Sequence, residues 1–279
     1  MNVVKTYWFH FVRSIFFAMG LIWLPLESFE GLSNQEALLP YWVFLILSVG
    51  VGIVAFLIDG FFWTGYLKSE ITIKSNSFDT GVCVRFGDLF EQDGWKAIAA
   101  NDFFDYIVDD DLVSSRSLHG QAISRFWDKN PEGWHDQIAR SLENDDFKKE
   151  QRDKGNKKRY DLGTTAVARN LNQQFLFVAL GKTNIDNNEA GATSESVICA
   201  VRCMLAKARS VCANEPLNIP LMGSGLARVG IKNALLVDLI LIAIFEETKK
   251  AKITDKISII LPRDKRLEIN LGSVKRDWS

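Results

Sequence analysis

Two long apolar runs near the amino terminus constrain this chain more than any other feature. The first extends from Tyr7 to Leu26 and the second from Tyr41 to Leu67. Each is long enough to supply the ~20 helical residues that cross a bilayer core. Aromatic residues that favour the membrane interface flank both runs, namely Trp8, Trp23, Trp42 and Trp63. The sequence therefore predicts a helical hairpin with transmembrane spans at about residues 7–26 and 41–63.

The charges around the two runs predict their orientation. Lys5 precedes the first run and Lys68 follows the second, whereas the link Glu27–Pro40 contains glutamates and neither Lys nor Arg. Loops on the cytoplasmic side of a membrane carry the excess of Lys and Arg. Both termini are therefore expected in the cytoplasm.

Two other interpretations compete with a membrane hairpin. The first run resembles a cleaved signal sequence, but no small-x-small cleavage site follows Leu26 and a second apolar run comes after it. A hairpin buried in a soluble protein is the other alternative. Helices that are hydrophobic on all sides need a surrounding core, and the rest of this chain does not supply one.

Arg13 and Asp59 are the charged residues at membrane depth. Burying either one in lipid costs about 2.5–3.5 kcal/mol, and their axial offset in an antiparallel hairpin is roughly 7 Å. Either they form an ion pair, within one chain or between neighbours, or Arg13 reaches the interface and Asp59 already lies there. Ser48, Gly50 and Gly52 permit close helix approach, which favours oligomerisation.

After Ser69 the hydrophobic period changes, and the sequence predicts a second domain, residues 68–279. Short β-rich runs alternate there with segments of helical spacing, an order typical of an α/β fold with a layered sheet. The expected strands are Glu70–Lys74, Val82–Phe86, Trp95–Ala100, Leu176–Leu180, Leu217–Leu221 and Ile257–Leu261. The expected helices are Leu118–Asp128, Gly133–Glu143, Ser194–Ala213 and Asn233–Ala251.

Several segments of this domain carry no evident chemistry. Residues 145–159 include seven Lys or Arg and are expected to form an exposed loop, with anionic lipid as an alternative contact. Cys199 and Cys203 lie on an apolar helix face and are expected to be reduced core residues. The three histidines lack the spacing of a metal site. A net charge of −1 excludes the overall basicity of a nucleic-acid-binding protein.

Four loops that follow predicted strands carry groups suited to phosphate and ribose. Asp88 follows the Val82 strand, and Asn101 ends the Trp95 strand. Ser114–Gly120 (SSRSLHG) leads into a helix whose first N–H groups favour an anion. Met222–Arg228 (MGSGLAR) contains glycines that let backbone N–H groups approach a phosphate. Ligand sites in α/β sheets form at such strand ends.

The order of these motifs resembles the macro domain, an ADP-ribose-binding module, over nearly all of Ser69–Ser279. The segments SLHGQ, YDLGTTA and PLMGSGLARVG are similar, more specifically, to the membrane-anchored macro-domain effectors of Thoeris anti-phage defence, which also carry two amino-terminal spans. The resemblance implies a three-layer α/β/α macro-domain sandwich, preceded by a transmembrane hairpin over residues 1–67. It also implies a multi-pass protein of the bacterial inner membrane, with the macro domain in the cytoplasm.

The same resemblance implies the ligand contacts. Asp88 would pair with the adenine amino group beside Leu89, and Asn101, next to Ala100, would meet the distal ribose. The pyrophosphate would lie between Ser117, Leu118, His119 and Gly120 on one side and Gly223, Ser224, Gly225 and Leu226 on the other. Arg228 would either add positive charge there or form a structural ion pair.

The function implied is that of a ligand-gated effector without a cofactor, a metal or a nucleic-acid partner. A TIR-domain enzyme would consume NAD and release an ADP-ribose-derived signal, histidine-linked in this branch. Binding of that signal would drive homo-oligomerisation, disrupt the lipid bilayer and kill the infected cell. No catalytic residue is expected, because Ile98 replaces the first Asn of the hydrolytic Asn-Ala-Ala-Asn motif.

Two alternatives to this effector remain. One is a membrane-tethered ADP-ribosyl hydrolase that uses the same pocket, with Asp102, Asp105 or the Asp109–Asp111 run as the base. The other is a passive membrane scaffold, which would have no affinity for such a ligand.

Overall fold

The computed structural model describes residues 7–33, 39–74, 80–170, 172–225 and 229–279. The chain divides into two compact units. The first comprises Met1–Ser69 and Asn270–Asp277, and the second comprises Glu70–Ile269 and Trp278–Ser279. The first unit thus takes in a carboxy-terminal segment that the sequence pattern assigned to the α/β domain.

The first unit is helical. Its elements are α2 (Trp8–Ser33), α3 (Tyr41–Ile58), the π-helical turn η1 (Asp59–Trp63) and most of α8 (Leu271–Trp278). Two of its helical stretches, Trp8–Leu32 and Tyr41–Trp63, are long and apolar enough to cross a membrane. The second stretch matches the expected span at residues 41–63.

Helix α2 differs from the expected span because it continues to Ser33 instead of ending at Leu26. The expected span ended where the link with its glutamates begins at Glu27, and Pro25, which cannot donate a backbone hydrogen bond, lies inside the helix. Leu26, Phe29 and Leu32 extend the apolar spacing beyond the proline. Helices of membrane proteins tolerate such interruptions.

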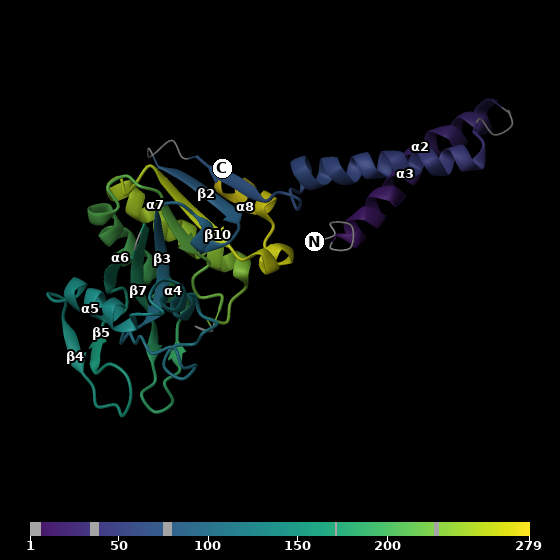
Figure 1. Cartoon of the computed structure of the whole chain (residues 1–279). Helices are drawn as coiled ribbons and strands as arrows, with labels where there is room; N and C mark the ends of the chain where they lie inside the picture. The colour runs from purple at the N-terminus through teal and green to yellow at the C-terminus, as the bar shows by residue number, and fades with distance from the viewer. Residues whose placement is uncertain (1–6, 34–38, 75–79, 171, 226–228) are drawn as a thin grey trace. The chain divides into compact units, whose positions relative to one another are not determined.

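Helices α2 and α3 pack along each other as a hairpin (Figure 1). The buried side chains of α3 recur every four residues and so share one face: Phe44, Ser48, Gly52 and Phe56. A Cβ atom on Gly52 would lie 2.9 Å from the Cα atom of Ile15. Close approach of the two helices therefore depends on this glycine. The two ends of the hairpin sequence are also joined by a salt bridge of 2.5 Å between Arg13 of α2 and Asp59 of η1.

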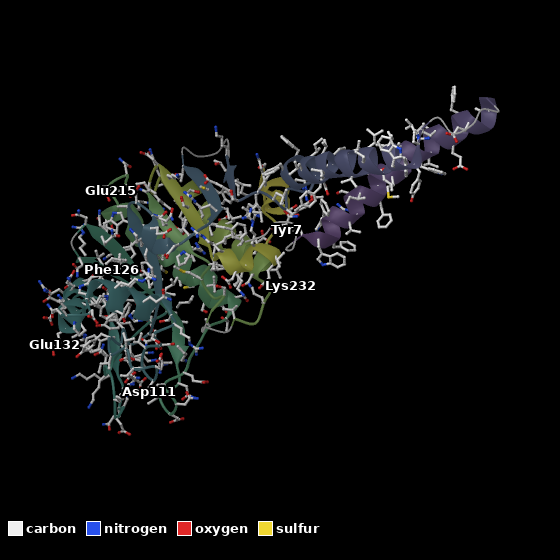
Figure 2. All side chains as sticks on the ribbon, turned by 45° about the vertical axis from the view of Figure 1, so that its right-hand side comes forward. Tyr7, Asp111, Phe126, Glu132, Glu215 and Lys232 are labelled. Carbon is white, nitrogen blue, oxygen red and sulfur yellow. The ribbon has the colours of Figure 1, made fainter. Side chains whose placement is uncertain are left out.

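The second unit is built on one mixed sheet of strand order β1-β2-β10-β9-β3-β7-β6, with β8 paired to β7. The five central strands run parallel, whereas β1 and β6 are antiparallel to their neighbours. The strands are β1 (Glu70–Ile73), β2 (Gly81–Phe86), β3 (Trp95–Asn101), β6 (Thr165–Asn170), β7 (Gln173–Thr183), β8 (Ala190–Gly191), β9 (Leu217–Pro220) and β10 (Lys256–Leu261). Figure 2 shows Glu215, just before β9, and Asp111 at opposite ends of this unit.

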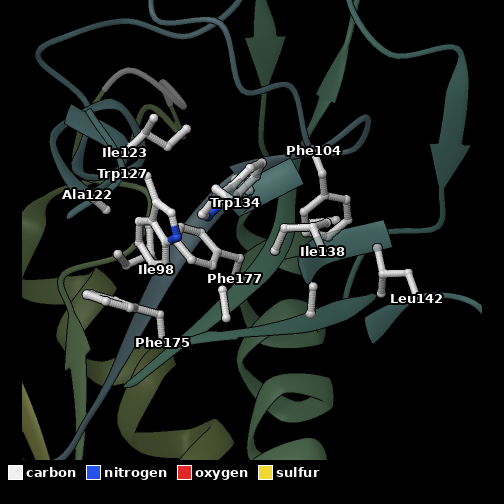
Figure 3. Close-up of a cluster of buried hydrophobic side chains, with 14 of the residues drawn as sticks. Ile98, Phe104, Ala122, Ile123, Trp127, Trp134, Ile138, Leu142, Phe175 and Phe177 are labelled. Atoms are coloured by element: carbon white, nitrogen blue, oxygen red, sulfur yellow. The ribbon is translucent and has the colours of Figure 1, made fainter. Parts of the chain in front are cut away.

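Helices cover both faces of the sheet. They are α4 (Leu118–Phe126), α5 (Pro131–Ser141), α6 (Ser194–Val211) and α7 (Asn233–Lys250), with short 3-10 turns η2 (Leu89–Glu91) and η3 (Arg263–Leu267). Ile98 and Phe177 pack with Trp134 of α5 in an aromatic core (Figure 3). The alternate residues Ala97 and Leu176 point to the opposite face, where α6 packs on β7. The three-layer α/β/α architecture expected from the resemblance is therefore observed.

Two expectations for this unit are wrong in part. The segment at residues 145–159 is not only a loop, because β4 (Phe147–Lys149) pairs antiparallel with β5 (Lys158–Tyr160), and Arg152 between them is buried. Cys199 and Cys203 are free thiols, as expected, but both are exposed. The reason is that α6 buries a neighbouring face, which consists of Ser196, Val197, Ala200, Val201, Met204, Leu205 and Ala208.

Candidate functional site

A cavity of about 1040 Å³ runs across the ends of several central strands of the sheet. Its lining comes from the segments that follow four neighbouring strands, β10, β9, β3 and β7. These strands are parallel, so the cavity lies at their carboxyl ends, the usual position of ligand sites in α/β sheets. Eight of the predicted site residues line it, namely Ala100, Asn101, Ser117, Leu118, His119, Gly223, Ser224 and Gly225.

The start of α4 forms one wall of the cavity. The Ser117 hydroxyl caps this helix by accepting a hydrogen bond of 2.9 Å from the Gly120 N–H. Gly120 itself does not line the cavity, and a Cβ atom there would collide with the Ser114 carbonyl. The glycine is therefore needed for the turn before the helix, while the unpaired first N–H groups of α4 make this wall suited to an anion.

His119 lines the cavity and is also packed into the aromatic core. Its side chain is buried against Trp134 and Phe177, with ring centroids 5.2 Å and 5.6 Å away. Burial lowers the pKa of this histidine to about 3, so the imidazole is neutral at physiological pH. His119 thus lies at the boundary between the cavity and the aromatic core.

The loop after β9 forms the opposite wall. Gly223 has a φ of +84°, and a Cβ atom there would lie 2.8 Å from the Val229 side chain. Gly225, by contrast, has no heavy atom of the described chain within 4 Å of a built Cβ atom, so its backbone faces open space. The Ser224 hydroxyl donates to the Leu221 carbonyl at 2.7 Å and fixes the turn. The predicted contacts Leu226 and Arg228 lie outside the described residues.

Asn101 lies at the end of β3, where a bulge between Ala100 and Asn101 shifts the pairing with β7. Its Nδ2 donates to the Asp105 carboxylate at 2.9 Å, and its Oδ1 accepts from the Asp105 N–H at 3.0 Å. The amide is therefore held in a fixed orientation at the cavity floor. Bulges commonly aim a side chain in this way beside a functional site.

Asp88 and Leu89 lie apart from the lining of this cavity. Asp88 caps η2 by accepting from the Phe90 N–H at 2.9 Å, and Leu89 is buried in the aromatic core. Asp88 nevertheless follows β2, which is hydrogen-bonded to β10. It is therefore one strand beyond the β10 end of the cavity, on the side where the resemblance places adenine.

Sequence reasoning missed two parts of the lining. One is Pro262, Asp264 and Lys265 after β10, and the other is the asparagine-rich segment 184–191 after β7. Both follow expected strands, so the rule that selected the other loops also applies to them. A run of Asn and Asp after a buried strand is also typical of an ordinary turn, so it is not a specific signal.

Three comparisons place this geometry among known proteins. Residues 82–262 match the family model described as "Thoeris protein ThsA, Macro domain". The Thoeris protein ThsA of Bacillus amyloliquefaciens (strain Y2) is 27% identical over 248 residues, which are 84% of this chain and 78% of that protein. That alignment extends well beyond the macro domain.

Solved structures agree on the fold. A point mutant of the Oceanobacillus iheyensis macrodomain superposes with a TM-score of 0.53 at 12% identity, over 75% of this chain and 97% of that one. The O. iheyensis macrodomain with ADP gives a TM-score of 0.52 at 11% identity, over 75% and 97% of the two chains. The family model covers most of the chain and the fold agrees with it, so this protein belongs to the family of the Thoeris protein ThsA macro domain.

Proposed function

We propose that this protein is a membrane effector of anti-phage defence, gated by an ADP-ribose-derived signal. The observation that carries the proposal is the cavity across four strand ends in a chain with two span-length apolar helices. An anion would lie between the start of α4 and the Gly223–Gly225 loop, where backbone N–H groups of both walls reach it. The solved O. iheyensis macrodomain structure with ADP has the same fold.

The proposed signal is histidine-linked ADP-ribose, made from NAD by a partner TIR-domain enzyme. Thoeris membership favours such a partner. The macro domain would bind the signal without a cofactor and drive hairpins of several chains together in the bacterial inner membrane, with both termini cytoplasmic. Two helices per chain cannot enclose a pore, so membrane disruption requires homo-oligomers.

The ligand must favour the active assembly over the resting one. A shift from 1:99 to 99:1 requires about 5.5 kcal/mol of differential binding, summed over the assembly. The contacts that form when both loops close around one pyrophosphate exist only with the ligand bound. If they form only in the active assembly, they supply this differential binding energy.

We propose binding without turnover. A hydrolase would need a carboxylate free to activate water near the distal ribose. Asp102 instead pairs with Arg159 at 2.7 Å, and Asp105 pairs with Arg152 at 2.9 Å, both as buried side chains. Lys154 contacts Asp109 and Asp111 of the third candidate, the Asp109–Asp111 run.

The test uses full-length protein in nanodiscs and dye-loaded liposomes. Calorimetry with ADP-ribose and histidine-linked ADP-ribose measures binding, chromatography of the recovered ligand measures turnover, and dye release with crosslinking measures the output. We expect binding, intact ligand and ligand-dependent release. Asp88→Ala should weaken binding. Asp93→Ala should not, because Asp93 lies before β3, at the amino-terminal ends of the strands and so away from the cavity. Recovery of cleaved ligand would support the hydrolase, and no binding would support a scaffold.

A further inference from the structure

A buried arginine joins two walls of the cavity without lining it. The side chain of Arg152, from the turn between β4 and β5, is 1% exposed. Its Nη1 donates to the Asp105 carboxylate at 2.9 Å, and its Nη2 donates to the Asn188 Oδ1 at 2.8 Å. Asn188 lines the cavity on the β7 side. Asp105 orients Asn101 on the β3 side, so one guanidinium holds both walls.

The turn that carries Arg152 is fitted closely to Asp105. Gly155 has a φ of +85°, and a Cβ atom there would lie 2.5 Å from the Asp105 Oδ1 and 3.1 Å from the Arg152 Nη1. The Asn156 N–H donates to the same carboxylate oxygen at 2.7 Å. Only a glycine permits this approach, and the buried carboxylate receives donors from three residues, Asn101, Arg152 and Asn156.

The network continues to the outer rim of the cavity. The Asn188 Nδ2 donates to Asp111 at 3.3 Å, and the Lys154 ammonium lies 2.9 Å from Asp111 and 2.5 Å from Asp109. Hydrogen bonds from Lys154 and then from Asn188 lower the pKa of Asp111. The turn between β4 and β5 therefore links three segments around the β7 side of the cavity. They are the residues at the end of β3, the Asp109–Asp111 run and the segment after β7.

The β7 end of the cavity is polar. Amides of Asn101, Asn184, Asn187 and Asn188 and carboxylates of Asp110 and Asp111 line it. Such groups accept hydrogen bonds from hydroxyl groups or from a positively charged substituent. Arg152 fixes Asn188 directly and Asn101 through Asp105, both from behind the lining.

We propose that Arg152 is a positioning residue that sets the specificity of the β7 end for the hydroxyl-rich or cationic group beyond the ligand's pyrophosphate. The inference rests on the proposed function, because it assumes that the adenosine half lies toward β10. It gives the turn between β4 and β5 that carries Arg152 a role in binding, although no residue of that turn lines the cavity within the described ranges.

The test compares ADP with ADP-ribose, which share the adenosine diphosphate and differ in the distal ribose. Calorimetry on full-length protein in nanodiscs measures the affinity ratio of the two probes. We expect Arg152→Gln to lower the affinity for ADP-ribose about tenfold relative to ADP, equivalent to one or two lost hydrogen bonds. Arg152→Lys keeps a positive charge beside Asp105 but cannot also hold Asn188. It should therefore lower the affinity for ADP-ribose relative to ADP, with a smaller fall in Tm than Arg152→Gln.

Arg159→Gln is the matched control. Arg159 comes from the same insertion, pairs with the buried Asp102 at 2.7 Å and donates to the Thr183 carbonyl at 2.7 Å. Neither Asp102 nor Thr183 lines the cavity. This variant should lower the Tm as Arg152→Gln does, yet leave the affinity ratio unchanged.

The outcomes separate the two proposals. If the wild-type protein binds ADP-ribose but Arg152→Lys leaves the ratio unchanged, Arg152 has no positioning role and the proposed function stands. An equal change in Arg159→Gln also overturns the inference, because the effect then follows stability alone. If the wild-type protein binds neither probe, the proposed function fails and the inference fails with it.

Discussion

The ring of His119 packs against the ring of Trp134 with centroids 5.2 Å apart, and no described residue provides a hydrogen-bond partner for its Nε2. A protonated imidazole would thus be a buried charge without compensation, which is why the pKa falls from 6.5 to about 3. In the unfolded chain the same histidine binds a proton below its ordinary pKa of 6.5. The folded state therefore loses stability by linkage as the pH falls.

His119→Phe should flatten the pH dependence of stability. Above pH 6.5 both states are neutral and the histidine contributes nothing to the pH slope. Between pH 6.5 and about 3 the unfolded state binds one more proton, so the free energy of unfolding falls by about 1.4 kcal/mol per pH unit. Urea unfolding at pH 7, 6 and 5 on both proteins measures the difference in slope. Identical slopes would mean that His119 is not buried as a neutral group.

His119 also illustrates how far the sequence leads toward the site. The spacing of SSRSLHG predicted a helix start, and the structure places the cap at Ser117 and the first helical residue at Leu118. The direction of the His119 ring depends on Trp134 and Phe177, which come from α5 and β7. Local periodicity contains no information about such contacts between distant elements.

The same distinction explains the strands. Runs buried on both faces, such as Leu176–Leu180 within β7 and Ile257–Leu261 within β10, are continuous and apolar and were predicted. β6 (Thr165–Asn170) is an edge strand that carries Arg169, and β4 is fully exposed, so neither shows that pattern. Arg152 was predicted to be solvated because it lies in a polar run with seven Lys or Arg. Its carboxylate partner lies 47 positions earlier in the chain, so the local sequence does not reveal the burial.

Gly223→Ala and Gly225→Ala should separate folding from ligand contact. At Gly223 the φ of +84° disfavours alanine, and Val229 and Val197 crowd the new methyl group, so we expect a loss of about 1–3 kcal/mol in stability. Gly225→Ala meets open space and should keep its Tm, while the added methyl group obstructs a phosphate at the loop. Thermal unfolding and ADP-ribose titration test both variants. Unchanged affinity in Gly225→Ala would place the pyrophosphate elsewhere.

Gly52→Ala and Gly50→Ala should distinguish packing within the hairpin from packing between chains. The Cβ atom at position 52 would lie 2.9 Å from the Ile15 backbone and force α2 away from α3. At Gly50 no described atom lies within 4 Å of the built Cβ atom. We expect Gly52→Ala to increase protease sensitivity of the hairpin in nanodiscs without ligand, and Gly50→Ala to leave it unchanged. Ligand-dependent crosslinking of Gly50→Ala then reports on contacts between chains alone.

Reversal of the salt bridge in the hairpin should test its role in the proposed membrane insertion. Arg13 and Asp59 lie 2.5 Å apart and neutralise each other across α2 and η1. Asp59→Ala leaves Arg13 unpaired, at a cost of about 2.5–3.5 kcal/mol on insertion scales. We expect the single variant to reduce the membrane-inserted fraction in glycosylation mapping, and Arg13→Asp with Asp59→Arg to restore it, because the charges again cancel. If Asp59→Ala inserts as well as the wild type, Arg13 must reach the interface by itself, and the ion pair contributes nothing to insertion.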